Sequence, residues 1–396
     1  MPKERIGIMG GTLNPVHRGH IAMALAAMES ASLDRVLFLP DGQPPHKAGI
    51  APAEDRWRML VAATAGLKHV EPCRMELDRP GTTYTYDTLT SLREQFPKAA
   101  LYYIIGADTL MQLKNWYRWE EVLPLCTFLV CPREFGGDRE EIRAERERLE
   151  GLGARFKPVR MDVMDVSSSG LREALARGED TPLLPVQVRE YCGLMGLYGM
   201  TPAVPEAAAW MPRLFGDLSP KRFAHTLGVV CSARELALAH GADLRSAMTA
   251  ALLHDCAKCL PLKEMQRIAR ENRLTEDPEI MDSGALLHAP VGAWMAEHVY
   301  GVTDPEILSA IAVHTTGCPG MGTLDMVVFL ADKIEPGRPG FPLLARMRET
   351  APRSLPGAMC LSLEGTADYV KESGRKLHPR SAETLTWVKS VLKESK

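Results

Sequence analysis

The sequence predicts a two-domain protein in which a parallel α/β domain is followed by an all-α domain. Up to residue 199, short β-rich runs alternate with amphipathic helical stretches, the pattern of a parallel sheet covered by helices. Beyond residue 206, apolar residues recur at helical spacing and no buried strand is predicted. The segment MTPAVPEAAAW, which starts at residue 200, contains two prolines and mostly small residues. We therefore predict an α/β domain over residues 1–199, a linker over 200–206 and a helical domain over 207–396.

The elements follow in order from these patterns. The predicted strands of the first domain are Arg5–Met9, Arg35–Leu39, Leu101–Ile105, Thr127–Cys131 and Arg155–Val159. The charged run Asp138–Gly151 predicts a solvated helix between the last two strands. In the second domain, the stretches RFAHTLGVVCSARELALAHG and RSAMTAALLHDCAK predict two helices with strongly apolar faces.

Composition limits the classes of partner. The formal net charge of −3 argues against a general nucleic-acid binder, so any anion site must be local. The chain enters a predicted strand at once, without a leader segment, and contains no run of about 18 uncharged apolar residues. Nine scattered cysteines do not form the pattern of a disulfide framework and suit a reducing compartment. We expect a cytoplasmic protein with no membrane or nucleic-acid partner; the sequence leaves its oligomeric state open.

The stretch GGTLNPVHRGH, residues 10–20, connects the first predicted strand to the first helix. In open α/β sheets, ligands bind at such strand-to-helix turns, where backbone amides face the crevice. Gly10 and Gly11 would let the backbone approach a phosphate, and His17 and His20, three positions apart, can face the same bound group. Donors aimed at phosphate oxygens suit nucleotidyl transfer. The alternatives are a surface histidine beside a helix-cap histidine, or half of a zinc site.

This stretch resembles the signature of the HxGH nucleotidylyltransferase superfamily, whose domains have a Rossmann-like parallel sheet. Further segments resemble bacterial nicotinate-nucleotide adenylyltransferases and follow one another in the family's order. They are PDGQPPHK (40–47), the pair Arg56 and Met59, GTTYTYDTL (81–89), IGAD (105–108), NWYRW (115–119), CPR (131–133) and VSSSGLR (166–172). The resemblance covers nearly all of residues 1–199.

The resemblance implies a role for each matched residue. The implied ATP phosphate site consists of Gly10, Gly11, Thr12, His17 and His20, closed by Ser168 and Arg172, with Lys47 adding charge and Mg²⁺ accompanying the ATP. The implied nicotinate side of the pocket consists of Thr85, Trp116 and Tyr117, with Asp108 at the ribose and Arg133 as a further substrate contact. Two positions depart from the family pattern: Leu13 replaces the usual aromatic residue, and Gly170 follows three serines where Ser-Ser-Thr-x is usual.

The helical half carries imidazoles and carboxylates inside apolar helical runs. They are His225, His254, Asp255, His288, His314 and Asp332. A buried carboxylate costs several kcal/mol unless it is paired or coordinated, so Asp255 within the run ALLHDCAK calls for a cation. A lone histidine in such a helix is more often a hydrogen-bonded core residue, but five such positions in one domain, with the adjacent His254 and Asp255 counted as one, favour a metal site. His240 and His298 fit less well, and Cys256 and Cys259 are interpreted as incidental because they lie inside the predicted His-Asp helix.

The order H…HD…H…H…D resembles the HD-domain metallophosphohydrolase superfamily. The segments ALLHDCAK, HAPVGA, HTTGCPGM, LADKIEPGR and KLHPRSAETLTWV resemble bacterial symmetrical diadenosine-tetraphosphate hydrolases of this class. By this resemblance one metal is held by His225, His254, Asp255 and Asp332, and a second by His288 and His314, with Asp255 bridging. Lys258 would stabilise phosphate charge one helical turn after His254, and Arg338 would face the polyphosphate. The mixed ligands favour Fe, Mn or Mg, with Fe or Mn expected.

Together the two resemblances imply a bifunctional enzyme. Its first half would make nicotinate adenine dinucleotide and pyrophosphate from nicotinate mononucleotide and ATP. Its second half would hydrolyse diadenosine tetraphosphate to two ADP. The alternatives are an HD half that is a regulatory nucleotide-binding module, an HD half that hydrolyses another nucleotide, a first half that serves another nucleotidyl acceptor such as the nicotinamide mononucleotide, and a non-enzymatic scaffold.

Overall fold

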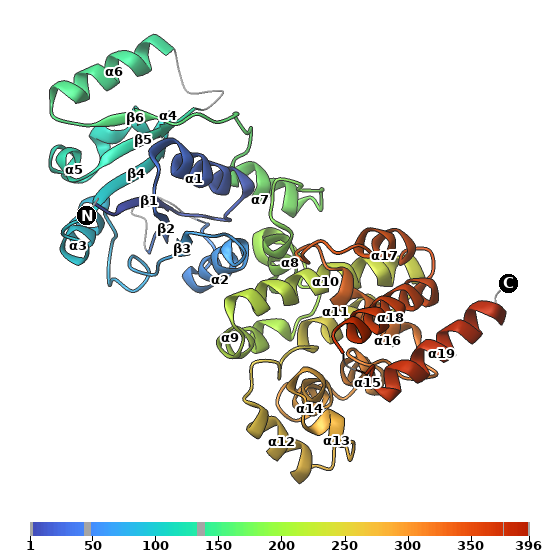
Figure 1. The fold of residues 1–396 in the computed structure, drawn as a ribbon. Helices are drawn as coiled ribbons and strands as arrows, with labels where there is room; N and C mark the ends of the chain where they lie inside the picture. Colours follow the sequence, from blue (N-terminus) through green and yellow to red (C-terminus); the bar gives the residue numbers. More distant parts are fainter. Residues whose placement is uncertain (1–2, 43–48, 133–138, 375, 395–396) are drawn as a thin grey trace. The chain divides into compact units, whose positions relative to one another are not determined.

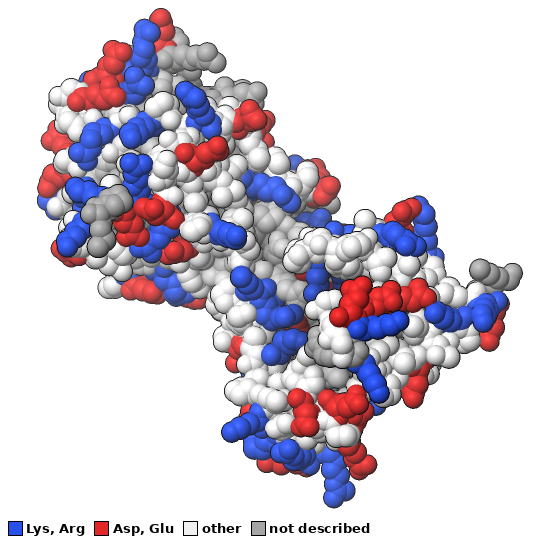
Figure 2. Space-filling model, in the orientation of Figure 1, with Lys and Arg blue, Asp and Glu red and all other residues white. Residues whose placement is uncertain are grey.

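The computed structural model describes residues 3–42, 49–132, 139–374 and 376–394. The chain forms two compact units. The first unit contains Met1–Arg189 and Tyr198–Met200, and the second contains Glu190–Leu197 and Thr201–Lys396. On the face shown in Figure 2, acidic and basic side chains are interspersed over each unit, in keeping with the small net charge.

The first unit is built on a parallel six-stranded sheet of order β3-β2-β1-β4-β5-β6 (Figure 1). Its strands are β1 (Arg5–Gly11), β2 (Arg35–Pro40), β3 (Val70–Pro72), β4 (Ala100–Gly106), β5 (Thr127–Cys131) and β6 (Phe156–Pro158). Its helices of four or more residues are α1 (Arg18–Ala31), α2 (Ala53–Thr64), α3 (Thr85–Gln95), α4 (Ala107–Leu110), α5 (Trp119–Val122), α6 (Arg139–Gly151), α7 (Ser168–Ala176) and α8 (Val186–Met195), the last of which continues into the second unit. The strand order reverses between β1 and β4, and ligands of such sheets bind at the carboxyl ends of the strands at that point.

The alternation of side chains along β1 explains how both faces of the sheet are covered. Ile6 and Ile8 are fully buried and pack in a core that includes Leu89 of α3. Gly7 faces the other side, where a Cβ atom would lie only 2.7 Å from the side chain of Leu33, the second residue after α1. The glycine therefore lets the end of α1 approach the sheet closely.

The predicted α/β pattern is confirmed, with differences in detail. All five predicted strands are present, and β3 is an additional short strand. The predicted charged helix is α6; its predicted first residue, Asp138, lies outside the described residues. Leu149 anchors this otherwise polar helix because its side chain is fully buried.

All regular secondary structure in the described residues of the second unit is helical (Figure 1). Its helices are α9 (Ala207–Asp217), α10 (Pro220–His240), α11 (Leu244–Leu253), α12 (Leu262–Glu271), α13 (Pro278–Met281), α14 (Gly284–His298), α15 (Pro305–Val313), α16 (Thr323–Ile334), α17 (Leu344–Thr350), α18 (Leu355–Glu372) and α19 (Pro379–Glu394). Helix α10 packs against α11 and α16, and α15 packs against α11, α14 and α16.

Capping residues fix where the central helices begin. The Ser219 hydroxyl accepts a hydrogen bond from the backbone N–H of Arg222 at the start of α10, where Pro220 occupies the first turn. Asp243 accepts one from Ser246 at the start of α11, at 2.7 Å. Gly241 ends α10 with a φ of 67°, a left-handed conformation that glycine adopts without strain.

The predicted His-Asp helix is wrong in its extent. Helix α11 ends at Leu253, His254 is its C-terminal cap, and the residues from Asp255 to Cys259 form successive turns. Lys258 therefore does not follow His254 within a helix, and Cys256 and Cys259 do not lie inside one. The turns carry Asp255 away from the helix axis and toward the histidines of neighbouring helices.

Among the described residues, none of the cysteines forms a disulfide, and five of them are buried. None of the helices in the described part of the chain has both the length and the apolar character needed to span a bilayer.

Two candidate active sites

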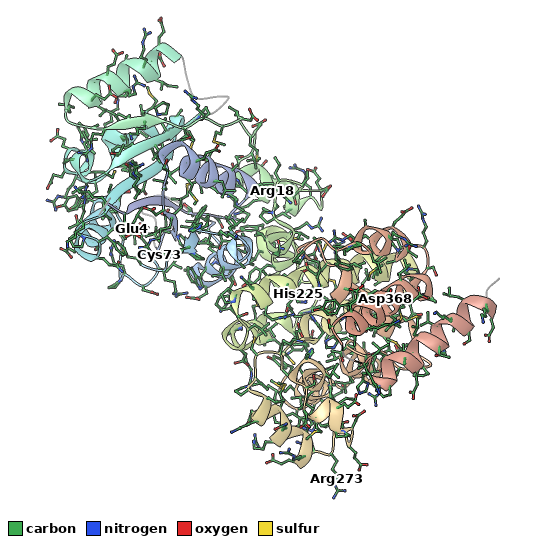
Figure 3. The ribbon with its side chains drawn as sticks, in the orientation of Figure 1. Glu4, Arg18, Cys73, His225, Arg273 and Asp368 are labelled. Atoms are coloured by element: carbon green, nitrogen blue, oxygen red, sulfur yellow. The ribbon has the colours of Figure 1, made fainter. Side chains whose placement is uncertain are left out.

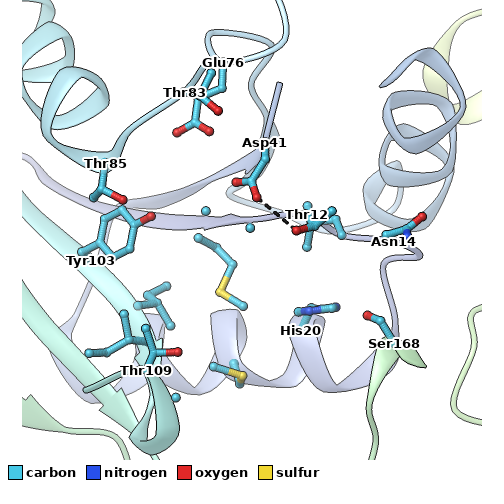
Figure 4. A pocket seen from close by; sticks show the side chains of 18 of the residues that line it. Thr12, Asn14, His20, Asp41, Glu76, Thr83, Thr85, Tyr103, Thr109 and Ser168 are labelled. Carbon is cyan, nitrogen blue, oxygen red and sulfur yellow. Dashed lines mark hydrogen bonds between the residues drawn. The ribbon is translucent and has the colours of Figure 1, made fainter. Parts of the chain in front are cut away.

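The first unit contains a cavity of about 750 Å³ at the carboxyl ends of β1 and β4 (Figure 4). Most of the predicted nucleotide-site residues line it: Gly10, Gly11, Thr12, His17, His20, Thr85, Trp116, Tyr117, Ser168 and Arg172. Asp108 lies on α4 beside the cavity, whose described lining includes its neighbours Gly106 and Thr109. Lys47 and Arg133 lie outside the described residues.

His17 and His20, in the loop and helix start after β1, form a stacked pair. His17 is the N-terminal cap of α1, and its backbone N–H donates to Nδ1 of His20 at 3.2 Å. The two imidazole rings stack with their centroids 3.7 Å apart. Because Nδ1 of His20 accepts a hydrogen bond, a neutral ring carries its proton on Nε2. His20 thus offers an N–H donor to a ligand in the cavity.

A buried arginine holds the loops around these histidines. The Arg56 guanidinium is 1% exposed and donates to four backbone carbonyls. The acceptors and distances are Thr12 at 3.0 Å, Asp41 at 2.7 Å, Gly42 at 3.2 Å and Ala51 at 3.1 Å. One side chain therefore links the turn after β1 to the segment after β2.

The start of α7 closes the loop from another side. The Ser168 hydroxyl donates to the carbonyl of Pro15 at 3.1 Å, and Arg172 donates to the carbonyl of Asn14 at 2.8 Å. Ser167 caps this helix by accepting from the N–H of Gly170 at 3.1 Å, so the glycine lies in the first turn and not in the helix interior. Leu13, the other departure from the family pattern, is buried in the cavity wall.

An acidic pair to which the sequence analysis gave no role, Asp41 and Glu76, faces the same cavity. Figure 4 shows Asp41 and Glu76 on one side of it, with the Thr12 hydroxyl donating to Asp41 at 3.1 Å. Glu76 is 5% exposed and accepts from Thr88 at 2.8 Å. Burial and then the charge of Asp41 raise the pKa of Glu76 to about 7. Glu76 belongs to none of the predicted strands and stands in no motif, so no sequence signal singled it out.

The second unit brings the six predicted imidazoles and carboxylates to one buried centre. His225 comes from α10, His288 from α14 and Asp332 from α16, while His254 and His314 cap the ends of α11 and α15. Figure 3 labels His225, which lies among the packed helices. A cavity of about 310 Å³ opens onto the centre.

The carboxylate of Asp255 lies between two groups of histidines. Its Oδ1 lies 3.0 Å from Nε2 of His288 and 3.9 Å from that of His314. Its Oδ2 lies 3.2 Å from Nε2 of His254 and 3.7 Å from that of His225. Asp332 joins the second group, since its Oδ1 is 3.0 Å from Nε2 of His225. The geometry is that of a carboxylate able to serve two ions at once.

Hydrogen bonds at Nδ1 turn the Nε2 atoms toward the centre. His254 and His314 each have Nδ1 2.7 Å from a backbone carbonyl three residues earlier, and His288 has a carbonyl at 3.2 Å four residues earlier. A ring that donates from Nδ1 presents a lone pair at Nε2, the form in which neutral histidine binds metals.

The electrostatics of the centre favour ionised carboxylates and, at His288 and His314, neutral imidazoles. Against the effect of burial, hydrogen bonds to Asp332 and Glu335 raise the pKa of His225. Although burial opposes it, His254 holds the pKa of Asp255 well below its usual value. Against the same effect of burial, Lys333 and His225 hold the pKa of Asp332 well below its usual value. Burial lowers the pKa of His288, and burial with the neighbouring His254 lowers that of His314 further.

The donor set fits a hard divalent cation. Two groups, His225-His254-Asp332 and His254-Asp255-His314, each place their ligand atoms within 4.8 Å of one another. The Nε2 atoms of His225 and His254 are buried and make no hydrogen bond of acceptable geometry, although carboxylate oxygens lie 3.0 and 3.2 Å away. A cation between these atoms would satisfy them, and the mixture of imidazole and carboxylate suits iron, manganese or magnesium better than a thiolate zinc site.

Four cationic side chains border this cavity: Arg222, Lys258, Lys333 and Arg338. Arg338 donates to Oδ1 of Asp332 at 2.6 Å, and Lys333 reaches its Oδ2 at 2.8 Å. Lys258 places its Nζ 3.2 Å from Nδ1 of His288, and burial lowers the pKa of this lysine. Arg222 and Lys333 were not predicted, because single cations near a helix start or end are usually solvated.

Comparisons with known proteins divide the chain in the same way. A cytidylyltransferase-like family model matches residues 8–174, and an HD domain model matches residues 222–337. A Gloeobacter violaceus protein named "Probable nicotinate-nucleotide adenylyltransferase" is 43% identical over 199 residues, which cover 49% of this chain and 96% of the relative.

A second relative covers both halves of the chain. A Mycoplasma pneumoniae protein named "Probable nicotinate-nucleotide adenylyltransferase/Ap4A hydrolase" is 29% identical over 84% of this chain and 88% of its own length. A Clostridium acetobutylicum crystal structure, titled as a "predicted HD superfamily hydrolase involved in NAD metabolism", is 34% identical with a TM-score of 0.45. It covers 46% of this chain and 96% of its own.

The sheet with its histidine loop and the helices with their His/Asp centre define a nucleotidylyltransferase-type domain joined to an HD domain. More narrowly, the chain belongs to the nicotinate-nucleotide adenylyltransferase family, in a form that carries an HD domain after the transferase half.

Proposed function

We propose that the first unit transfers the adenylyl group of ATP to nicotinate mononucleotide. A phosphate oxygen of the mononucleotide attacks the α-phosphorus of ATP, and the bond from that phosphorus to the departing pyrophosphate breaks. The products are nicotinate adenine dinucleotide and pyrophosphate. The observation that carries this proposal is the cavity in which the stacked His17–His20 pair lies together with Trp116 and Tyr117.

Each part of this cavity has a role in the proposed reaction. The His20 N–H and the Arg172 guanidinium bind phosphate oxygens and stabilise the charge that develops during transfer. Gly10 would let the backbone approach the nucleotide, and its lack of a Cβ atom also leaves room for the Tyr103 hydroxyl in the cavity wall. Thr85, Trp116 and Tyr117 receive the nicotinate ring, and Asp108 contacts the ribose. Lys47 and Arg133 keep their expected roles, and Mg²⁺ accompanies ATP.

The test is a product analysis with two acceptors. The protein is incubated with ATP, Mg²⁺ and either nicotinate or nicotinamide mononucleotide, and the dinucleotides are separated by chromatography. The proposal predicts the nicotinate dinucleotide with equimolar pyrophosphate and at least tenfold less product from nicotinamide mononucleotide. Equal turnover of both would contradict the assigned acceptor, and no dinucleotide from either would refute the transferase.

We infer that the helical unit hydrolyses diadenosine tetraphosphate symmetrically. Water attacks one of the two inner phosphorus atoms, and the bond to the central bridging oxygen breaks, so that both products are ADP. The carrying observation is Asp255, whose two oxygens face two different groups of histidines. His225, His254 and Asp332 would hold one ion with Oδ2, and His288 and His314 a second with Oδ1. Bound divalent ions would supply Lewis-acid activation of the phosphate and of water.

The cations around the cavity complete this proposal. Lys258 and Arg338 bind the polyphosphate, which carries several negative charges along its length.

We propose that the resident metal of the helical unit is iron or manganese. We also propose that the protein is cytoplasmic, and that its domains span residues 1–199 and 207–396 with a linker over 200–206.

The test supplies diadenosine tetraphosphate to full-length protein reconstituted with Fe²⁺, Mn²⁺ or Mg²⁺. The proposal predicts ADP as the only product, at two per substrate. AMP and ATP in equal amounts would show a different cleavage position. No cleavage with any of the three ions, by protein that binds them, would refute the assigned substrate.

A further inference from the structure

The four histidines of the metal centre do not have equivalent supports. Three of them place Nδ1 against a neutral backbone carbonyl of their own helix. His225 instead places Nδ1 3.2 Å from Oε1 of Glu335, a carboxylate. Glu335 is the residue that follows α16, and it contacts the Nδ1 edge of a ligand carried by α10.

Glu335 is held rigidly in this position. Its side chain is 3% exposed, and its Oε2 accepts from the backbone N–H of Gly337 at 2.5 Å. The Arg348 guanidinium donates to the carbonyls of Ile334 and Glu335 at 2.9 and 2.7 Å and fixes the backbone. Gly228 of α10 leaves the necessary space, because a Cβ atom there would lie 2.5 Å from Oε2 of Glu335.

The Glu335 carboxylate lies on a side of the centre that is rich in cations. Three cations contact the carboxylates that an ion would use here: Arg222 at Asp255, and Lys333 and Arg338 at Asp332. A divalent ion must compete with all three. Glu335 is a buried negative charge beside them that is not itself turned to the centre, since both of its oxygens are engaged by His225 and Gly337.

We propose that Glu335 is a positioning residue that selectively strengthens metal binding on the Asp332 side of the centre. It fixes the proton of His225 on Nδ1, so that the Nε2 lone pair faces the ion. It also makes this imidazole a stronger metal ligand than the three histidines whose Nδ1 atoms face backbone carbonyls. Its charge also offsets part of the cationic surroundings. This inference rests on the proposed function only in requiring that the centre binds divalent ions.

The test is a calorimetric titration of metal-free, full-length protein with Mn²⁺ for wild type, Glu335→Gln and Asp325→Asn. Asp325 is the matched control: it is a buried carboxylate on α16 that accepts from the backbone N–H of Gly322 at 2.9 Å, and its substitution makes the same change in charge. His225→Asn identifies which of two binding events belongs to the Asp332 side.

The expected result is two Mn²⁺ binding events in wild type. In Glu335→Gln, the Mn²⁺ affinity of the event that is absent in His225→Asn falls by about 10- to 100-fold. The affinity of the other event stays within about twofold of wild type. Asp325→Asn changes neither. Equal affinities in Glu335→Gln and wild type would overturn the inference, and so would an equal loss at both events. Because these readouts contain no substrate, wild type that binds two ions but leaves diadenosine tetraphosphate intact would refute the proposed hydrolase and not the role of Glu335.

A second variant keeps the inference testable if Glu335→Gln does not fold, as judged by circular dichroism. Lys333→Gln removes a cation that contacts Asp332. It is expected to tighten the same Mn²⁺ binding event several-fold, a gain that misfolding cannot produce. An unchanged or weaker event in Lys333→Gln would contradict the charge balance on which the role of Glu335 depends.

Discussion

Arg222 donates a 2.7 Å hydrogen bond to Oδ2 of Asp255, a carboxylate whose side chain is only 2% exposed. The arginine itself lines the cavity and is 30% exposed, so it can exchange this contact for a phosphate oxygen of a substrate.

Removal of Arg222 tests this exchange. Arg222→Gln is expected to raise KM for diadenosine tetraphosphate about 10- to 100-fold, the scale of a charge-assisted hydrogen bond, with a smaller effect on kcat. Steady-state kinetics on metal-reconstituted protein measures both constants. Arg267→Gln is the control, because Arg267 pairs with Glu264 and Glu271 on exposed α12. A fall in kcat at constant KM would contradict a substrate-binding role.

His20 is expected to act in the transition state of adenylyl transfer. His20→Ala should lower kcat for dinucleotide formation about 10²- to 10³-fold, the typical effect of removing one preorganised donor. A continuous pyrophosphate assay measures the rate. His69→Asn serves as the control: His69 is exposed in the same unit with a φ of 61°, which asparagine tolerates. If both variants lost the same activity, a specific role for His20 would be wrong.

Glu76 predicts a pH-dependent stability of the first unit. Its pKa is about 7 in the folded protein against 4.5 for an ordinary glutamate, so the folded state binds more protons than the unfolded state between these values. Its favourable contribution is therefore complete below about pH 4.5 and is lost as the pH rises through 7. Glu76→Gln keeps an acceptor for the Thr88 hydroxyl and removes the buried charge.

The measurement is urea unfolding of the first unit at pH 5.5 and pH 8. The free energy of unfolding of Glu76→Gln minus that of wild type should be larger at pH 8 than at pH 5.5 by about 2 to 3 kcal/mol. If the variant and wild type differed in free energy of unfolding by the same amount at both pH values, Glu76 would not titrate in this range.

Arg56 predicts a coupled loss of stability and nucleotide affinity. Arg56→Met leaves four loop carbonyls without their donor and should destabilise the first unit by about 3 kcal/mol or more. The KM for ATP should rise because the turn after β1 is no longer fixed. Urea unfolding and transferase kinetics check the two effects. A destabilised variant with an unchanged KM for ATP would show that nucleotide binding does not depend on Arg56 fixing the turn after β1.

The sequence predicted the parts of the fold that have strong periodicity. Five of the six strands and the α/β-to-helical change were recognisable because short β-rich runs alternate with amphipathic stretches and then give way to helical periodicity. The strand β3 was missed because Val70 is the only β-favouring residue of Val70–Pro72, whereas Phe156 and Val159 marked the equally short β6. The end of α11 was missed because HDCAK continues the composition of the helix, whereas tertiary contacts draw Asp255 into the metal centre.

The prediction of the sites was limited in a similar way. Motifs identified residues that act on ligands, such as His20 and Asp255. Arg56 and Glu335 stood inside segments that match the families, but the motifs did not indicate what these side chains contact: Arg56 donates to four loop carbonyls, and Glu335 lies 110 positions from the histidine it supports. Their roles depend on long-range packing, which only the folded chain reveals.

The measurement that tests the account most directly compares wild type and Asp255→Asn in both proposed reactions with the same full-length preparations. Asp255→Asn retains the size of the side chain but replaces the carboxylate between the two histidine groups. The account predicts that wild type releases two ADP per diadenosine tetraphosphate and forms nicotinate adenine dinucleotide, and that the variant loses at least about 10³-fold of the hydrolysis while its adenylyl transfer is unchanged. Undiminished hydrolysis by Asp255→Asn, or a parallel loss of both activities, would contradict it.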